Sequence, residues 1–162
     1  MKFKGIILAG GKGTRLNPLT KSVNKHLLPI YNKPLIFYPL SILMLANIKE
    51  ILIIVNEEDY DSYKKLLGNG SRMGIKITYK IQEKPNGIPE AFTIGKDFIQ
   101  NSNVALILGD NFFYSQGLTE TLIQSQKNFN GAKIFCYKVK NPNEFGIAEI
   151  KNKKIISLKE KP

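Results

Sequence analysis

Two short apolar runs constrain the fold of this chain more than any other feature of its sequence. Residues 51–55 and 104–108 are each five residues long, uniformly aliphatic, and bounded by polar or turn-forming residues. Runs this short and this apolar are typical of strands that are buried on both faces, as in a parallel sheet. We therefore expect a parallel sheet covered by helices on both sides.

Strand and helix signals alternate along the rest of the chain. Further strands are predicted at 3–9, 75–81 and 133–139, with a terminal hairpin at 146–150 and 154–158. Helices are predicted at 35–46 after Pro34, at 56–67 capped by Asn56, at 88–99 and at 118–129. This alternation predicts an α/β fold with a mostly parallel, mixed central sheet, formed by one domain over residues 1–162.

The composition narrows the classes of partner. The 162 residues include 24 Lys and Arg against 13 Asp and Glu, a net charge of +11, which suits an anion without identifying it. A nucleic-acid-binding module is the alternative, but the seven Tyr and nine Phe form no stacking stripe, so we expect no nucleic-acid partner. No apolar run approaches the ~18 residues of a membrane span, and the single cysteine, Cys136, fits a cytoplasmic protein without disulfides.

A glycine-rich loop directly follows the first predicted strand. Gly10, Gly11 and Gly13 leave backbone N–H groups unshielded and can form a concave site for a polyphosphate, although an ordinary tight turn is the alternative. Arg15 lies in the same loop and is one of two arginines among the 24 basic residues, which favours a bidentate phosphate contact. The spacing fits neither a Walker P-loop nor a dinucleotide fingerprint.

Three further polar residues are candidates for the site. Lys25 is either a second phosphate contact or a solvated charge, and His26, the only histidine, suits a polar contact better than a catalytic base. Asp110 follows the predicted strand 104–108. Ligands bind at the carboxyl ends of parallel strands, so Asp110 is a natural Mg²⁺ ligand, with a turn or helix-cap aspartate as the alternative.

Taken together, these motifs resemble those of the sugar-nucleotide pyrophosphorylases, and most closely the glucose-1-phosphate thymidylyltransferases. The matching segments, in the family's order, are GGKGTRL (10–16), KHLLP (25–29), KPLI (33–36), LGDN (108–111), FG (145–146) and EKP (160–162). The resemblance implies a Rossmann-like three-layer sandwich of the nucleotide-diphospho-sugar transferase type. It also implies a truncated chain, because the family's second metal-binding aspartate and the rest of its sugar pocket would lie beyond Pro162.

The activity implied by the resemblance is a Mg²⁺-dependent nucleotidyl transfer. A phosphate oxygen of glucose 1-phosphate would attack the α-phosphorus of dTTP, giving a dTDP-sugar and pyrophosphate. Arg15 and Lys25 would be the catalytic residues that offset charge on the phosphates, and Asp110 would bind the metal. We also expect the full-length relatives to be homo-oligomers.

The resemblance further implies two groups of binding residues. The expected nucleotide-binding residues are Leu8, Gly10, Gly11, Gly13, Thr14, Arg15, Lys25, His26, Gln82, Gly87 and Asp110, with Gln82 and Gly87 reading the pyrimidine base. The expected sugar-phosphate residues are Gly146, Glu160 and Lys161. His26 stands where thymidylyltransferases usually have glutamine, so dTTP and UTP both stay open as the nucleotide. A catalytically incomplete nucleotide-binding fragment is a further alternative.

Overall fold

The computed structural model describes residues 2–11, 13–84, 86–127, 129–152 and 154–160. The contacts of the chain group into two units, residues 1–127 and 128–162, and each has its own architecture. Within the described residues, no helix is both long enough and apolar enough to cross a membrane. The expected single domain over residues 1–162 stays a prediction.

The first unit is built on a four-stranded parallel sheet. Its strands are β1 (Phe3–Leu8), β4 (Glu50–Val55), β5 (Lys76–Ile81) and β6 (Asn103–Leu108), in the order β5-β4-β1-β6. All three neighbouring pairs are parallel. The prediction of a parallel sheet is confirmed, and residues 51–55 and 104–108 both lie in it. Residues 51–55 are all buried, as predicted, whereas β6 ends the strand order and only Ile107 of it is buried, so the prediction that 104–108 is a buried strand was wrong in its burial.

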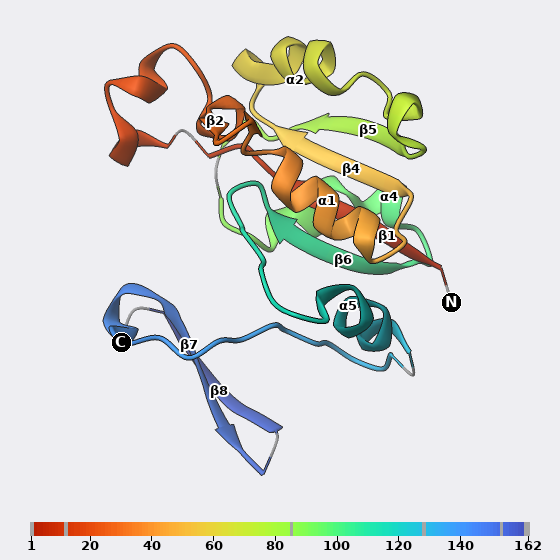
Figure 1. The fold of residues 1–162 in the computed structure, drawn as a ribbon, viewed down its shortest axis with the longest axis vertical. Helices are drawn as coiled ribbons and strands as arrows, with labels where there is room; N and C mark the ends of the chain where they lie inside the picture. Colours follow the sequence, from red (N-terminus) through yellow and green to blue (C-terminus); the bar gives the residue numbers. More distant parts are fainter. Residues whose placement is uncertain (1, 12, 85, 128, 153, 161–162) are drawn as a thin grey trace. The chain divides into compact units, whose positions relative to one another are not determined.

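Helices cover both faces of this sheet, as Figure 1 shows for α1 and α4. In the part of the first unit that the structure describes, the α-helices are α1 (Phe37–Leu45), α2 (Tyr60–Leu67), α3 (Glu90–Ile94), α4 (Lys96–Ile99) and α5 (Leu118–Gln126). Successive residues of a strand point to opposite faces, and the buried residues divide accordingly. Ile7, Ile51 and Ile53 pack with α1 and α2, whereas Ile6 and Leu52 pack with Ala91 of α3.

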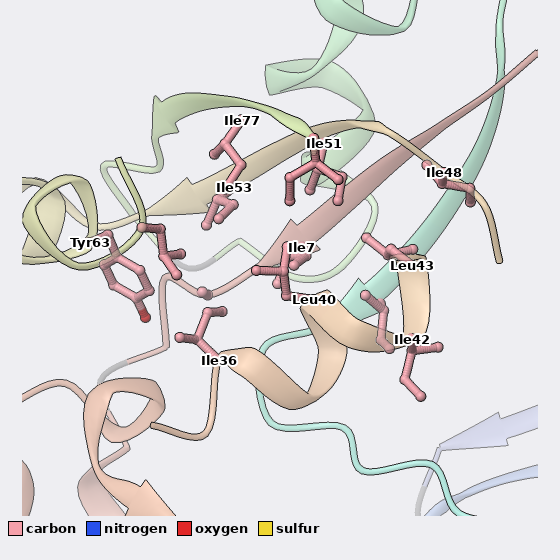
Figure 2. Close-up of a cluster of buried hydrophobic side chains, with 14 of the residues drawn as sticks. Ile7, Ile36, Leu40, Ile42, Leu43, Ile48, Ile51, Ile53, Tyr63 and Ile77 are labelled. Carbon is pink, nitrogen blue, oxygen red and sulfur yellow. The ribbon is translucent and has the colours of Figure 1, made fainter. Parts of the chain in front are cut away.

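The larger of the two cores lies between the sheet, α1 and α2. In Figure 2 the side chains of Leu40 and Leu43 from α1 face those of Ile7 and Ile51 from the strands. Tyr63 of α2 is fully buried at one end of this core. Burying each such aliphatic side chain contributes about 1.5–3 kcal/mol, so this core fixes the sheet that carries the site.

The connections between these elements contain short turns and one small hairpin. Among the described residues of the first unit, 3-10 turns lie at η1 (Thr14–Leu16), η2 (Leu19–Lys21), η3 (Lys25–Leu27), η4 (Glu57–Asp59) and η5 (Ser71–Met73), and a further turn, η6 (Pro142–Glu144), lies in the second unit. Strands β2 (Pro29–Ile30) and β3 (Lys33–Pro34) pair antiparallel.

Several predicted helix boundaries were wrong. Pro34 does not start a helix, because it lies in β3, opposite Pro29, and α1 begins only at Phe37. Asn56 does not cap a helix through its side chain, and its buried Oδ1 has no partner among the described residues. The predicted helix 88–99 is two short helices, α3 and α4, that meet at Gly95.

The second unit contains one antiparallel hairpin, formed by β7 (Gly146–Lys151) and β8 (Lys154–Glu160). This hairpin was predicted, but the predicted strand at 133–139 was wrong: those residues belong to no ladder in the described part of the chain. A largely apolar segment forms a strand only where a neighbouring backbone supplies the hydrogen bonds, and the local sequence does not specify that neighbour. Ile134 and Phe135 are about half exposed, at 50% and 49%.

Candidate functional site

The topology of the parallel sheet brings two loops together. After β1 the chain builds β4 and β5 on one side, and then it returns to place β6 on the other side of β1. Both β1 and β6 therefore end at the same edge, where the strand order reverses. The Gly109 amide donates to the Leu8 carbonyl (2.9 Å), which holds the two strand ends side by side. Ligands of open α/β sheets bind at such a switch point.

A cavity of about 280 Å³ opens at this edge. The described residues that line it are Leu8, Gly11, Gly13, Lys25, His26, Gln82, Gly87, Ile88, Leu108 and Asp110. Eight of these are expected nucleotide-binding residues, although their roles stay predictions. Leu108 was named only as part of the motif LGDN, and Ile88 was not anticipated. Gly10, Thr14 and Arg15 do not line the cavity, and Thr14 and Arg15 lie in the exposed turn η1 beside it.

The backbone of the glycine loop requires glycine at position 13. Gly13 has φ 61° and ψ 31°, the left-handed region, and a Cβ there would lie 2.8 Å from the Cβ of Lys25. The Thr20 hydroxyl donates to the Gly13 carbonyl (2.9 Å) and fixes the loop from outside. At Gly11, by contrast, an added Cβ would meet nothing within 4 Å, so this part of the loop presents open backbone to the cavity.

Lys25 and Asp110 form an ion pair at the cavity wall. The Lys25 Nζ lies 2.5 Å from the Asp110 Oδ2, and the two side chains are 27% and 35% exposed. Burial raises the pKa of Asp110, but the hydrogen bond and the charge of Lys25 outweigh it and hold the pKa below its usual value. The cavity therefore carries an ionised carboxylate and a cation side by side.

A buried polar network holds His26 in the cavity wall. The Asn24 Oδ1 accepts hydrogen bonds from the His26 backbone amide (2.9 Å) and from the Tyr63 hydroxyl (3.1 Å). The Tyr63 hydroxyl lies 3.2 Å from the His26 Nδ1, and Asn24 Nδ2 donates to Asp59 Oδ2 (2.7 Å). Tyr63 of α2 and Asn24 thus position His26.

The same burial sets the charge of His26, which is only 4% exposed. Burial lowers the pKa of His26 to about 4, against a smaller opposing effect of the Asp110 charge. The imidazole is therefore neutral near pH 7. The expectation that His26 makes a polar contact is consistent with this network.

Gln82 and Gly87 line another part of the cavity. Gln82 follows β5 and is 5% exposed, and its backbone amide donates to the Val55 carbonyl (2.7 Å). Its Nε2 donates to the Glu90 Oε2 (2.5 Å) on the first residue of α3. Glu90 carries no motif of its own and was missed from the sequence.

Two further residues near the cavity were also missed. A Cβ on Gly109 would lie 2.9 Å from the His26 Cδ2, so glycine permits the close approach of this loop to the imidazole. Tyr63 bears the hydroxyl beside His26, yet the two are 37 positions apart. The motif LGDN contained Gly109 and could have indicated it, whereas nothing local to Tyr63 points to His26.

The donor set for a metal in this cavity is small. Among the described residues, no three or more His, Cys, Asp or Glu side chains gather in a metal-binding group. Asp110 is ionised and lines the cavity next to the open loop. Mg²⁺ usually keeps several waters and takes one or two carboxylates together with substrate phosphates, so a single carboxylate at a phosphate loop fits such an ion.

In the second unit, Gly146 and Glu160 face each other across the hairpin as register partners. Gly146 also lines a cleft of about 910 Å³ between the hairpin and residues 134–139. The ladder thus brings two of the three expected sugar-phosphate residues together, and Lys161 lies outside the described residues.

Comparisons with known proteins point to one group. Residues 4–162 match the family model described as nucleotidyl transferase. A glucose-1-phosphate thymidylyltransferase of Neisseria meningitidis is 55% identical over 161 residues, which is 99% of this chain and 56% of that protein. One of Xanthomonas campestris is 48% identical over 98% of this chain and 54% of its own length. The chain thus spans about half the length of these relatives.

Solved structures agree with the sequence matches. The structure of a putative glucose-1-phosphate thymidylyltransferase from Bacillus anthracis in complex with sucrose has a TM-score of 0.90 and 40% identity, and the match covers 99% of this chain and 65% of that one. A UDP-glucose pyrophosphorylase from Acinetobacter baumanii has a TM-score of 0.78 at 18% identity over 68% of its chain, which indicates a shared fold alone. The predicted fold type is confirmed, and this chain spans about two thirds of the length of these solved chains.

Proposed function

Because this chain belongs to the nucleotidyl transferase family, we propose that it carries the nucleotide-binding part of a glucose-1-phosphate thymidylyltransferase. The substrates would be dTTP and glucose 1-phosphate, and the products a dTDP-sugar and pyrophosphate. The observation that carries this proposal is the composition of one cavity. It combines open loop backbone at Gly11, the Lys25–Asp110 pair, and the polar side chain of Gln82.

The glycine loop would bind the triphosphate. Backbone N–H groups around Gly11 and Gly13 offer hydrogen bonds to phosphate oxygens, and the loop shape is already set by the Gly13 backbone and Thr20. A preformed loop of this kind aligns the α-phosphorus without further ordering. In phosphoryl transfer, such positioning and charge neutralisation supply most of the catalysis.

Lys25 and Asp110 would both help to neutralise the negative charge of the phosphates, Lys25 directly and Asp110 by holding Mg²⁺. In the free chain they neutralise each other across 2.5 Å. With nucleotide bound, Lys25 would turn its ammonium to the phosphates, and Asp110 would hold Mg²⁺ together with phosphate oxygens. Mg²⁺ supplies neutralisation of the developing negative charge. Arg15 is exposed on η1 next to the loop, and its guanidinium would offset the negative charge of the departing pyrophosphate.

His26 would support the site without carrying charge. Its pKa of about 4 keeps the imidazole neutral, so it adds no cation beside Lys25. Its neighbours Asn24 and Tyr63 fix its orientation. The difference between dTTP and UTP is a 5-methyl group and a 2′-hydroxyl, and a UTP-using enzyme is the alternative within the same chemistry.

A nucleotide-binding fragment without turnover is the second candidate. It is favoured by the share of its relatives that the chain covers, 56% for the Neisseria meningitidis protein. Sugar binding would draw on Gly146 and Glu160 of the second unit, together with Lys161. Such a fragment would bind dTTP without releasing pyrophosphate.

A pyrophosphate-release assay with glucose 1-phosphate, Mg²⁺ and either dTTP or UTP separates these functions. If the transferase is active, Lys25→Ala should lower the rate about a hundredfold, because one charge-stabilising donor contributes about 3 kcal/mol to the barrier. Lys21→Ala is the matched control, since Lys21 is an exposed lysine outside the cavity lining. Binding of dTTP without pyrophosphate release would support the fragment, and absence of both would refute the nucleotide site.

A further inference from the structure

The side-chain amide of Gln82 is fixed from one side by a carboxylate. Its Nε2 donates to the Glu90 Oε2 at 2.5 Å. Glu90 is itself held, because its Oε1 accepts from the Asn86 Nδ2 (2.9 Å) and its Oε2 accepts from the Asn86 backbone amide (3.3 Å). A buried amide, a carboxylate and a turn asparagine therefore form one small network next to the cavity.

The chemistry of this network decides which end of the amide faces which way. The hydrogen bonds from Gln82 and then Asn86 lower the pKa of Glu90, so this side chain is ionised near neutral pH. An ionised carboxylate only accepts hydrogen bonds. The NH₂ end of the Gln82 amide must therefore face Glu90, and the carbonyl oxygen must face away from it.

The carbonyl oxygen of Gln82 lies against the glycine loop. A Cβ on Gly10 would be 2.6 Å from this Oε1, so glycine at position 10 leaves room for the oxygen. Gln82 lines the cavity, and among the described residues no donor is paired with its Oε1. The amide thus offers a hydrogen-bond acceptor beside the phosphate loop.

An acceptor at this point suits one class of nucleobase. Thymine and uracil carry an N–H donor at N3, whereas cytosine has a bare acceptor nitrogen there and an amino group at C4. A carbonyl oxygen accepts the N3–H of thymine or uracil and faces the lone pair of cytosine. A site built to pair one polar group discriminates strongly against an analogue that leaves this group unpaired.

We propose that Glu90 is a positioning residue that locks the Gln82 amide with its oxygen toward the nucleotide and so excludes cytosine nucleotides. This inference rests on the proposed function, because it requires the base of a nucleoside triphosphate to lie against Gln82. The inference also defines which bases Glu90 can discriminate. Thymine and uracil share the same N3–H edge, so Glu90 separates both of them from cytosine and does not separate dTTP from UTP.

Equilibrium binding of dTTP, UTP and dCTP to the whole chain tests this proposal. In Glu90→Ala the acceptor for the Gln82 amide is lost, the amide can turn, and the preference for dTTP over dCTP should fall by about tenfold, as expected for one hydrogen bond. Glu90→Gln keeps an acceptor oxygen at this position and should retain most of the preference. The ratio of dTTP to UTP affinity should stay constant in both variants.

Glu120→Ala is the matched control. Glu120 is exposed in the first turn of α5, as Glu90 stands in the first turn of α3, so both substitutions remove a carboxylate from the start of a helix. The control should leave the preference for dTTP over dCTP unchanged. An unchanged preference in Glu90→Ala as well would overturn the inference, while dTTP binding by the unaltered chain would leave the proposed function standing.

A second measurement needs neither nucleotide nor a stable alanine variant. In the nucleotide-free chain, the side-chain NH₂ protons of Gln82 should exchange with solvent more slowly than those of the exposed Gln124, because Glu90 holds them. Rapid exchange at Gln82 would refute the lock. If the chain binds no dTTP at all, the proposed function fails and the specificity claim fails with it, whatever the exchange rates are.

Discussion

The buried neutral His26 makes the stability of this chain depend on pH in a defined window. The folded state takes up the His26 proton near pH 4, because burial lowers its pKa, whereas the unfolded chain takes it up near 6.5. Below pH 6.5 the unfolded state therefore binds more protons than the folded state. The free energy of unfolding consequently decreases as the pH decreases. The contribution is fully present above pH 6.5 and is lost as the pH falls toward 4.

The size of this effect follows from the two pKa values. Each unit of difference corresponds to 1.36 kcal/mol, so the shift from 6.5 to about 4 gives a total loss of roughly 3 kcal/mol. By pH 5 the loss should already be about 2 kcal/mol. His26 is the only histidine, so no other imidazole contributes in this window.

This effect is measured by urea unfolding of the chain and of the variant His26→Gln at pH 7, 6 and 5, and the free energies of unfolding of the two proteins are compared. Glutamine does not titrate and can still hydrogen-bond, and carboxylates such as Glu50 contribute equally to both proteins. The free energy of unfolding of the chain should fall by about 2 kcal/mol more than that of the variant between pH 7 and pH 5. Parallel curves for the two proteins would refute a neutral, buried His26.

Two further predictions concern the loop and the carboxylate. Gly13→Ala should lower the free energy of unfolding in urea by about 1–3 kcal/mol, because position 13 has a left-handed backbone and the new Cβ would contact Lys25. Gly11→Ala should change it by less than about 0.5 kcal/mol, because the space around position 11 is open. Equal effects of the two substitutions would contradict the loop geometry. Asp110→Asn should change stability by no more than about 1 kcal/mol, because the ion pair is partly exposed, yet should lower Mg²⁺-dependent pyrophosphate release about a hundredfold. Unchanged release would remove Asp110 from the reaction.

The parallel sheet could be predicted because its signals are local. Residues 51–55 and 104–108 are apolar on both faces, and this pattern leaves few alternatives to a covered parallel strand. The proximity of Asp110 to the glycine loop then followed from topology, since neighbouring parallel strands end at one edge. Asp110 and the loop glycines Gly11 and Gly13 are conspicuous in the sequence, and all three line the cavity.

Other features depended on contacts between distant residues. The Tyr63 hydroxyl meets His26 and Asn24 only because α2 packs on the sheet, and no periodicity in the sequence indicates this. The segment 133–139 was predicted as a strand, but a ladder needs a partner strand that the local sequence does not specify. Glu90 was overlooked because a helix-starting glutamate is ordinary unless its partner Gln82 is known.

In the proposed function, the cavity between the ends of β1 and β6 binds a pyrimidine nucleoside triphosphate. An NMR titration of the ¹⁵N-labelled chain with dTTP and Mg²⁺ tests it most directly. The largest shifts should occur at the amides of Gly11, Gly13, Gln82, Gly87 and Asp110, which share the cavity lining. Saturable binding that leaves these amides unmoved, or no binding at millimolar dTTP, would contradict it.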